Sequence, residues 1–542
     1  MLSSLTQVLL HSKNVPLKAL SQPLIFSHER FSIDSKSLID DHSNNSVSNS
    51  NEPDGSIKNS PGQLVIHCPA FPELQHFQNT NYPRKLPSIC RWWDWRKVQR
   101  ETEDQHFSIL PQQKTFWPEL ERNVTRFNDT GLDCTLVDIL NKHKFTTPTE
   151  IQREAIPSVL SGKTCMIAAE SGSGKTFAYL VPLIQRVIEC KKNFKGVQDV
   201  NSPFGIILCS TRQLASQIHD VLQMFTSELD FDAGLVIGGS GMMDDVDSKF
   251  VKSDLVVASF GMLEKMVSQG KYSLRNVKYV VLDDAGALFE MVKEDLNDLL
   301  NLMKVHNEQS RNGESLQFVL TCSAIPMYFN ENVKRVLNIE DIESISSPNL
   351  HMLQPHVKHS FYPLSRDGKM KYLWRLVHES VEKKEPMLIF SNSSEIAKWI
   401  HYSLDRKISN CVTINHQTIA PLRSSNYKAF QNGEVYICSS LVTYFRTVDT
   451  TNVKRVLNYD LPFDAFDYTH RSGRVGRIGS PKNCEVINFV RRFDPELDMV
   501  ERIEMAARMN APLFDDAKNP LCRQSNRNQP RDTTYDFQSY RN

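Results

Sequence analysis

The sequence predicts an α/β fold with two mainly parallel sheets, each flanked by helices. Short apolar runs bounded by turn residues alternate with amphipathic segments of helical period, which is the pattern of parallel strands joined by helical crossovers. The alternation breaks at residues 346–356 and then resumes, which divides the strands into two groups. The expected strands are 204–209, 254–258, 279–283 and 317–321 in the first group, and 387–391, 435–438, 455–458 and 484–489 in the second.

Composition narrows the classes of protein that this chain can be. It has 542 residues, with 63 Lys and Arg against 63 Asp and Glu, so any surface that binds nucleic acid must be local. The eleven cysteines form no C-x-x-C pair and no cluster with His, which predicts reduced thiols without disulfides or structural zinc. No apolar run approaches the roughly 20 residues that cross a bilayer, so we expect no membrane span.

The two ends of the chain differ in composition from its centre. Residues 1–35 carry leucines, serines and lysines but no acidic residue before Glu29, which indicates a possible organellar transit peptide or, alternatively, a disordered terminus. Residues 36–63 are rich in Ser, Asn, Asp and Gly, so we expect a disordered spacer, followed by an N-terminal extension over 64–119. A disordered tail is expected at 514–542 for the same reason.

A glycine-rich stretch follows the apolar run 164–168 and precedes the helical segment 177–187. In this context glycines let successive backbone N–H groups face an anion, a lysine reaches the outer phosphates and a threonine hydroxyl can hold Mg²⁺. A surface turn without a ligand does not need these features together. The stretch therefore predicts a nucleoside triphosphate site formed by Ala169, Glu170, Ser171, Gly172, Ser173, Gly174, Lys175 and Thr176.

The motifs around this loop resemble, in order, those of the DEAD-box RNA helicases of superfamily 2, over about residues 127–513. Phe127 and Gln152 are similar to the family's adenine-binding motif, in which an aromatic ring stacks on the base and an amide reads its edge. A buried glutamine at a helix start is the purely structural alternative for Gln152. The resemblance implies two tandem RecA-like domains, at 120–345 and 357–513, joined by a linker at the break in the strand pattern.

The strongest match lies in the second domain, where the sequence HRSGRVGR reproduces the family's motif VI. The resemblance implies that Arg474 and Arg477 reach the γ-phosphate across a domain cleft, a role worth about 10³ to 10⁵ in rate in other NTPases. A solvated basic face is the alternative, which the interleaved glycines disfavour. Motif V is more eroded, because Leu441 and Val442 stand where Thr and Asp are expected, although Asp449 is retained and is implied to bond the ribose.

The resemblance also implies contacts with RNA. Arginine side chains and backbone amides in loops can hold sugar and phosphate without reading sequence, which suits a protein that acts on the shape of RNA. The implied contacts are Arg212 of motif Ia, the pair Gly238 and Gly239, Ser259 of motif Ib and Asn392 of motif IV.

The sequence departs from the family where residues for hydrolysis are expected. Asp283 is retained and is implied, with Thr176, to hold Mg²⁺ largely through water. Asp284 replaces the Glu that orients the attacking water, and a carboxylate misplaced by roughly 1 Å can cost about 10²-fold in rate. Gly286 lacks the fourth carboxylate of the namesake tetrapeptide, and Ile325 lacks the motif III hydroxyl that normally bonds to it, so the two losses are complementary.

These motifs together imply an ATP-dependent RNA helicase, an RNA-stimulated ATPase acting on structured RNA with ATP and Mg²⁺ as cofactors and with attenuated turnover. A likeness to mitochondrial DEAD-box proteins of ribosome assembly, carried by 168–170, Met262 and 500–508, implies a mitochondrial location, ribosomal or other RNP assembly proteins as partners and a monomeric core. A cytoplasmic or nuclear location is the alternative. The catalytic residues implied are Lys175, Asp283, Asp284, Arg474 and Arg477.

Two other functions remain open from the sequence. The erosion of motifs II, III and V favours a hydrolysis-deficient RNA-binding assembly factor that keeps the ATP site as a structural or slow switch. A P-loop ATPase unrelated to nucleic acid leaves motifs Ia and VI unexplained.

Three tryptophans, Trp92, Trp93 and Trp95, stand in the N-terminal extension within the sequence RWWDWRK. Tryptophan and arginine side chains can stack on unpaired bases. The structural alternative is that these tryptophans anchor the extension onto the first domain, and the sequence favours this alternative.

Overall fold

The computed structural model describes the central part of the chain. The described residues are 63–78, 88–99, 105–112, 126–195, 198, 200–238, 252–309, 316–325, 329–339, 341–405, 411–414, 418–440 and 450–514. The predicted transit peptide, most of the spacer and the tail beyond Phe514 lie outside them. Within the described part, no helix is long and apolar enough to cross a membrane.

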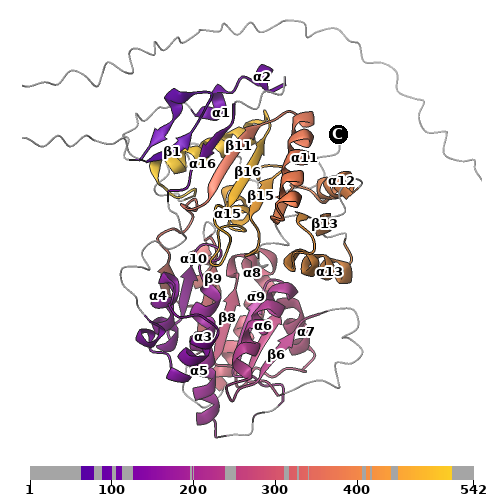
Figure 1. The fold of residues 1–542 in the computed structure, drawn as a ribbon. Helices are drawn as coiled ribbons and strands as arrows, with labels where there is room; N and C mark the ends of the chain where they lie inside the picture. The colour runs from indigo at the N-terminus through magenta and orange to yellow at the C-terminus, as the bar shows by residue number, and fades with distance from the viewer. Residues whose placement is uncertain are drawn as a thin grey trace, which may run out of the picture. The chain divides into compact units, whose positions relative to one another are not determined.

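The first domain is built on a seven-stranded parallel sheet in the order β10-β4-β9-β8-β5-β7-β6 (Figure 1). Strands β5, β7 and β8 are buried along their whole length, because helices cover both faces, and this explains their unbroken apolar sequences. The strands are β4 Cys165–Ala168, β5 Gly205–Cys209, β6 Ala233–Val236, β7 Leu255–Ser259, β8 Tyr279–Asp283, β9 Gln317–Cys322 and β10 Glu343–Ser346.

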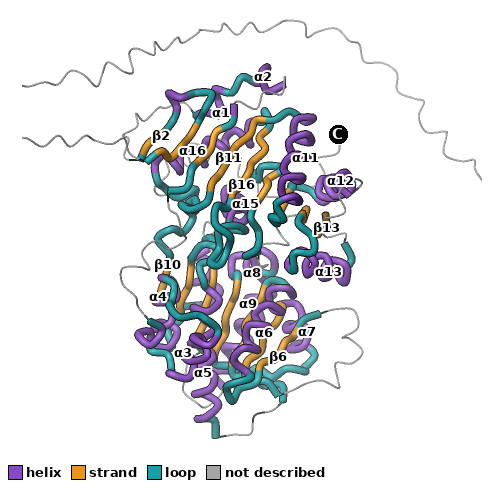
Figure 2. Tube along the Cα trace, in the orientation of Figure 1, coloured by secondary structure: helices purple, strands orange, loops and turns teal. Residues whose placement is uncertain are grey.

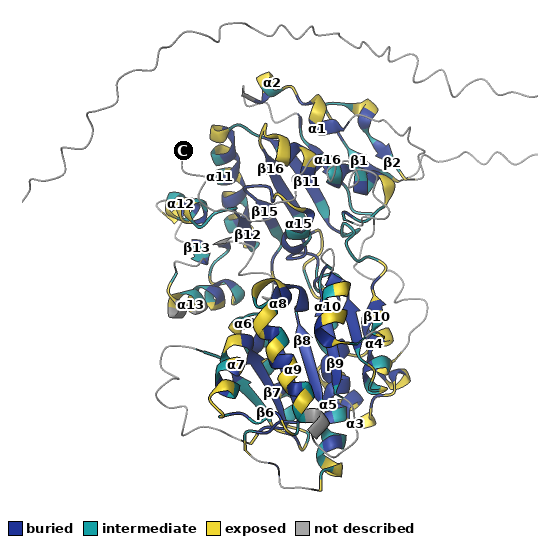
Figure 3. Cartoon of the chain, turned by 180° about the vertical axis from the view of Figure 1, so that it is seen from behind, coloured by how far each residue is buried: buried dark blue, intermediate teal, exposed yellow. Residues whose placement is uncertain are grey.

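Alternate residues of these strands enter two separate cores, one on each face of the sheet. The central strand β8 is buried throughout, whereas helices such as α9 carry exposed residues (Figure 3). Ile207 and Val281 pack with helices α3 to α6, whereas Ile206 and Val280 pack with α7 to α10. The helices are α3 Cys134–Lys142, α4 Glu150–Leu160, α5 Lys175–Asn193, α6 Arg212–Thr226, α7 Phe260–Ser268, α8 Ala285–Met291, α9 Lys293–Gln309 and α10 Phe329–Leu337, preceded by the 3-10 turn η5 Phe127–Thr130.

The second domain contains six parallel strands in the order β13-β14-β12-β15-β16-β11. Helices α11 and α12 cover one face, and α13, α15 and α16 the other (Figure 2). The elements are β11 Lys358–Pro363, α11 Arg366–Glu382, β12 Met387–Phe390, α12 Ser394–Asp405, β13 Cys411–Ile414, α13 Ala420–Gln431, β14 Ile437–Ser440, β15 Arg455–Asn458, α15 Ala465–Ser472, β16 Glu485–Val490 and α16 Asp494–Met509. Two parallel sheets flanked by helices confirm the predicted fold class.

The N-terminal extension belongs to the second sheet. Strand β3 pairs antiparallel with β11, and β1 and β2 continue the sheet, which becomes nine-stranded. Helix α1 packs on α16. The extension comprises β1 Leu64–His67, the 3-10 turn η2 Pro72–Leu74, β2 His76–Phe77, α1 Ile89–Trp92, α2 Trp95–Gln99 and β3 Phe107–Ile109.

Trp93, with Trp95 packed against the same core, therefore anchors the extension to the second domain, and the expectation that the tryptophans anchor it to the first is wrong. Trp93 is 4% exposed and packs in one core with Phe107 of β3 and Phe361 of β11. Trp95 contacts the Trp93 ring edge-on, whereas Trp92 is 41% exposed. The attachment was hidden in the sequence because strand addition depends on backbone hydrogen bonds, which carry little side-chain signature.

Candidate nucleotide site

The glycine-rich loop joins β4 to α5 in a tight curl. Gly172 and Gly174 have φ of +83° and +93°, a left-handed conformation that favours glycine. A Cβ on Gly174 would also lie 2.5 Å from Nε2 of Gln152. Helix α5 starts at Lys175, directly after the loop, so its N-terminal N–H groups and dipole form an anion site there.

Lys175 is held at the mouth of this loop by backbone carbonyl groups. Its Nζ donates to the oxygens of Ala169 at 2.6 Å and Glu170 at 2.9 Å. Burial lowers the pKa of Lys175 to about 8, although the charges of Glu170 and Asp283 oppose that shift. The ammonium group is therefore costly to keep charged here without an anionic ligand.

This lowered pKa predicts how nucleotide affinity depends on pH. The charged form of Lys175 predominates below pH about 8 and is lost above it, so ATP affinity should fall as pH rises through about 8, by up to about tenfold per unit. Titration of a fluorescent nucleotide from about pH 7.5 upward measures the slope. Lys175→Arg is the control, because an arginine stays charged and should give a flat profile. A flat profile for the wild type would contradict the prediction.

Asp283 ends β8 beside the loop and is the most constrained carboxylate of the site. Its Oδ1 accepts from the hydroxyl of Thr321 on β9, and its Oδ2 accepts from the hydroxyl of Tyr179 on α5 at 3.1 Å. Burial raises the pKa of Asp283, while Thr321, Tyr179 and Lys175 counteract the rise. The carboxylate faces Lys175, which agrees with a metal ligand next to a phosphate site.

Asp284 adopts a left-handed conformation, with φ of +56°, where the strand gives way to α8. Its backbone N–H donates to Asp283 Oδ1 at 3.2 Å and to Thr321 Oγ1 at 3.1 Å. These bonds hold the backbone of the turn next to Asp283. Gly286 is buried within α8.

The two residues of the predicted adenine-binding motif, Gln152 and Phe127, have different environments. Gln152 caps α4 by accepting from Thr149 N–H at 3.0 Å, and its Nε2 donates to the Gly174 oxygen at 3.0 Å, so it contacts the phosphate loop directly. Phe127 is 2% exposed within the core of the first domain. The ring lies in that core, and its predicted stacking on adenine stays a prediction.

The two motif VI arginines contact the phosphate loop from the second domain. Arg474 is 0% exposed, donates from Nη2 to the Ser171 hydroxyl at 2.8 Å and donates from Nε to the His470 oxygen at 3.0 Å. Arg477 packs so closely on Gly172 that a Cβ there would lie 2.7 Å from its Cγ. The loop and both arginines thus form one site with groups from both domains.

The residues implied to contact RNA differ in exposure, and some lie outside the described part of the chain. Arg212 begins α6 and donates to the Gly238 oxygen at 2.5 Å, which brings these two together on an exposed surface. Ser259 is 9% exposed at the junction of β7 and α7. Gly239 and Asp449 lie outside the described residues.

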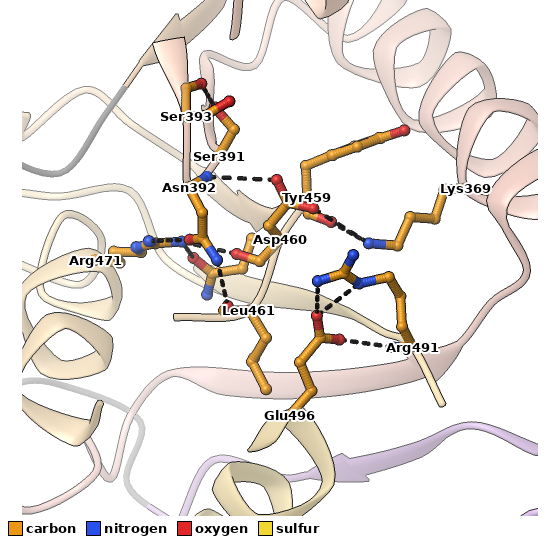
Figure 4. A network of polar contacts seen from close by, with 11 residues as sticks. Lys369, Ser391, Asn392, Ser393, Tyr459, Asp460, Leu461, Arg471, Arg491 and Glu496 are labelled. Atoms are coloured by element: carbon orange, nitrogen blue, oxygen red, sulfur yellow. Dashed lines mark hydrogen bonds and ion pairs between the residues drawn. The ribbon is translucent and has the colours of Figure 1, made fainter. Parts of the chain in front are cut away.

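Asn392 forms hydrogen bonds inside the second domain (Figure 4), and its predicted contact with RNA stays a prediction. Its Nδ2 donates to the Leu461 oxygen at 3.0 Å, and its Oδ1 accepts from Arg471 Nη2 at 2.7 Å. Its backbone N–H donates to Asp460 Oδ2 at 3.3 Å. The side-chain amide thus bonds at one end to Leu461 and at the other to Arg471 of motif VI.

Comparison with known proteins identifies the family. Residues 149–330 match the DEAD/DEAH box helicase profile, and residues 368–479 match the helicase conserved C-terminal domain. The probable ATP-dependent RNA helicase DDX28 of Mus musculus is 30% identical over 479 residues, which cover 84% of this chain and 86% of that protein. Its Homo sapiens counterpart is 30% identical over 485 residues, covering 85% and 88%.

The chain belongs to the DEAD-box family of ATP-dependent RNA helicases. Solved DEAD-box structures agree with the fold. Mss116p bound to ssRNA and AMP-PNP has a TM-score of 0.60 at 19% identity, covering 75% of this chain and 80% of that one. S. cerevisiae Dbp5 bound to RNA and ADP BeF3 has a TM-score of 0.57 at 20% identity, covering 72% and 94%.

Several residues that support this DEAD-box site were missed from the sequence. Thr321 and Tyr179 hold the Asp283 carboxylate, and Arg471 joins motif VI to Asn392. A hydroxyl at the end of a strand next to the aspartate strand is a signal that points to Thr321. Tyr179 carries no such signal, because an aromatic residue on a buried helix face is normally core.

The linker also forms hydrogen bonds beside the site, which the sequence did not indicate. His351 accepts from the Ile325 backbone N–H at 2.9 Å, so a linker residue bonds to the segment where the motif III hydroxyl is missing. Further along, His356 contacts the Gly476 oxygen at 2.7 Å, and Gln354 donates to the Val475 oxygen at 3.3 Å. The linker thus contacts motif III of one domain and motif VI of the other.

Proposed function

We propose that this chain is an RNA-stimulated ATPase with attenuated turnover that binds structured RNA through both domains and strains it locally. The observation that carries the proposal is the contact of Arg474 with Ser171, because it joins the motif VI arginine to the phosphate loop. An arginine at this position stabilises charge on a transferring phosphoryl group. Because Arg474 comes from the second domain and Ser171 from the first, hydrolysis should require that the two domains stay in contact, with RNA and ATP bound together.

ATP and Mg²⁺ fit the residues that are present. The loop amides and Lys175 would hold the phosphates, and Gln152, which already contacts Gly174, would read the adenine edge. Asp283 and Thr176 supply the oxygen ligands that Mg²⁺ prefers, largely through water. When bound, the ion would neutralise phosphate charge during transfer. Asp284 is the residue that would orient the attacking water.

The test is ATP hydrolysis by the full chain, in single-turnover and steady-state conditions, with and without single-stranded RNA. RNA-stimulated turnover that disappears in Lys175→Ala is the expected result. Nucleotide binding without turnover in the wild type would reject hydrolysis. It would favour the second candidate, an RNA-binding assembly factor.

That second function is favoured by the substitutions at Asp284, Gly286 and Ile325, which remove or shorten groups used for hydrolysis. The prediction that separates the two is Asp284→Glu. Restoring the longer carboxylate should raise the single-turnover rate by about 10²-fold, because it closes a gap of roughly 1 Å to the water. Asp284→Gln is the control, since it has the length without the charge and should not gain. An unchanged rate in Asp284→Glu would argue that the site has lost hydrolysis for other reasons.

We propose organellar RNA metabolism or ribosome assembly, in mitochondria, as the setting. The support is the N-terminal composition, which lacks acidic residues before Glu29. Fusion of residues 1–35 to a fluorescent protein, beside the full chain lacking them, tests the location. Cytoplasmic or nuclear signal from the fusion would reject it.

A further inference from the structure

A chain of buried polar side chains crosses the second sheet beneath α15, the helix that leads into the motif VI arginines. His359 Nδ1 contacts the Tyr468 hydroxyl at 2.8 Å, and Asn488 Nδ2 donates to the same hydroxyl at 3.4 Å. Asn458 Nδ2 then donates to Asn488 Oδ1 at 2.8 Å. Arg471 Nη1 completes the series by donating to Asn458 Oδ1 at 3.4 Å. We name these five residues the buried polar chain.

Polar side chains are unusual in the buried layer between the second sheet and α15. His359, Tyr468, Asn458 and Asn488 are each 0% exposed, and Arg471 is 3% exposed. Their strand neighbours on the same face are apolar, so valine or leucine would fill the space without the cost of removing polar groups from water. Directional bonds define one arrangement where apolar packing tolerates several. The arrangement that they define is that of α15 on the sheet.

The series continues from Arg471 to Asn392 of motif IV (Figure 4). It also leads, through the backbone, toward the nucleotide site. Arg471 Nη2 donates to Asn392 and Nη1 to the Asp460 oxygen at 2.8 Å. The Arg474 backbone N–H donates to the Arg471 oxygen at 3.2 Å, and the Arg474 side chain reaches Ser171. A displacement of Arg471 therefore displaces Arg474, because only one turn of backbone separates them.

We propose that the buried polar chain is a positioning device that fixes α15 on the sheet and so sets Arg474 for reading the γ-phosphate. The inference rests on the proposed function, since Arg474 needs a nucleotide to read. The five residues of the buried polar chain act through Arg474 and do not contact the nucleotide themselves.

The state of His359 agrees with this role. Burial lowers its pKa to about 3, so the ring is neutral throughout the physiological range and the contact with Tyr468 does not change with pH. Strand β3 of the N-terminal extension pairs with β11 at this point, with Ile109 opposite His359. The extension thus covers the edge of the sheet on which the buried polar chain begins.

The test compares affinities of the full chain for ADP and for ADP with beryllium fluoride, both with polyuridine RNA. Arg474 contributes only where a γ-phosphate mimic is present, so the ratio of the two affinities reports its position. Asn458→Leu, Asn488→Leu and Tyr468→Phe should each lower the preference for the beryllium adduct by about 10-fold, because a misplacement on the order of 1 Å can cost up to about 10²-fold. Their ADP affinity should stay unchanged.

The double variant Asn458→Leu with Asn488→Leu separates positioning from mere stability. The double variant removes both partners of the bond between Asn458 and Asn488, so it should lose less thermal stability than the two single variants added together, although Arg471, Tyr468 and the Ser360 oxygen still lose a partner. Its preference for the beryllium adduct should nevertheless be as low as that of either single variant. A preference restored to the wild-type value would overturn the inference.

The control is Tyr372→Phe, which removes a hydroxyl on the opposite face of the same sheet and should leave the preference intact. Failure of the inference is distinguishable from failure of the proposed function. Turnover in the wild type with unchanged preference in all the variants would overturn the inference alone. A wild type that prefers the adduct without hydrolysing ATP would reject the turnover, and the variants would still decide the inference. A wild type with no preference would overturn both.

Discussion

Replacing Arg474 by alanine should lower the single-turnover rate of ATP hydrolysis by about 10³-fold, with little change in ADP affinity. The guanidinium group is fully buried and bonds both His470, near the end of α15, and Ser171 of the phosphate loop. A charge so placed, away from water, acts strongly on a developing phosphoryl charge. Arg474→Lys should recover only part of the rate, because an ammonium group lacks the planar fork that reaches two acceptors.

Rates with saturating ATP and RNA, together with ADP affinity by fluorescence, measure this effect. Arg492→Ala is the matched control, since Arg492 is an exposed arginine of the same domain and its loss should leave the rate unchanged. A decrease of less than about tenfold in Arg474→Ala would mean that Arg474 does not act on the phosphate. An equal loss of ADP affinity would assign the residue a structural role.

The parts of the fold that the sequence predicted are those with local signals. The apolar run 279–283 gave β8 with the observed bounds, because a strand covered on both faces is apolar at every position. The phosphate loop is equally local, since its glycines and Lys175 are contiguous and their backbone angles follow from residue type. Strands with a mixed pattern, such as β6 and β10, were missed because partial exposure dilutes that signal.

The parts that the sequence did not predict depend on contacts between distant segments. The hydrogen bond of Asn392 to Arg471, 79 positions away, has no local signal in the sequence. The place of Phe127 in the core was not predicted either, because an aromatic residue suits a core or a binding site and only tertiary packing decides. The extension was placed on the wrong domain for the same reason. Its ties to α16 cross more than 400 positions of sequence.

The contacts of Glu504 with the extension predict a second large effect, on the stability of the second domain. Glu504 of α16 is 2% exposed and accepts from the Ser88 hydroxyl at 2.6 Å and the Ile89 N–H at 2.9 Å, both in the extension. It also pairs with Arg508 at 2.7 Å, whose Nη2 donates to the Leu74 oxygen at 2.8 Å. Burial raises the pKa of Glu504, and the charge of Arg508 opposes the rise. One carboxylate thus holds both an arginine and the start of α1.

Glu504→Ala should therefore destabilise the second domain by about 3 to 5 kcal/mol, because it leaves the buried charge of Arg508 without its partner and removes the acceptor for two donors of the extension. Loss of hydrogen-exchange protection in residues 88–92 and a lower melting transition measure the effect.

Glu501→Ala is the control. Glu501 lies on the same helix and bonds Arg91 of the extension at 3.2 Å, but in a partly exposed pair worth at most about 1 kcal/mol. If the two variants lost equal stability, the buried pair would not be what ties the extension to the domain. If only Glu504→Ala released the extension, residues 63–112 would be an integral part of the second domain, and any fragment of that domain lacking them should be unstable.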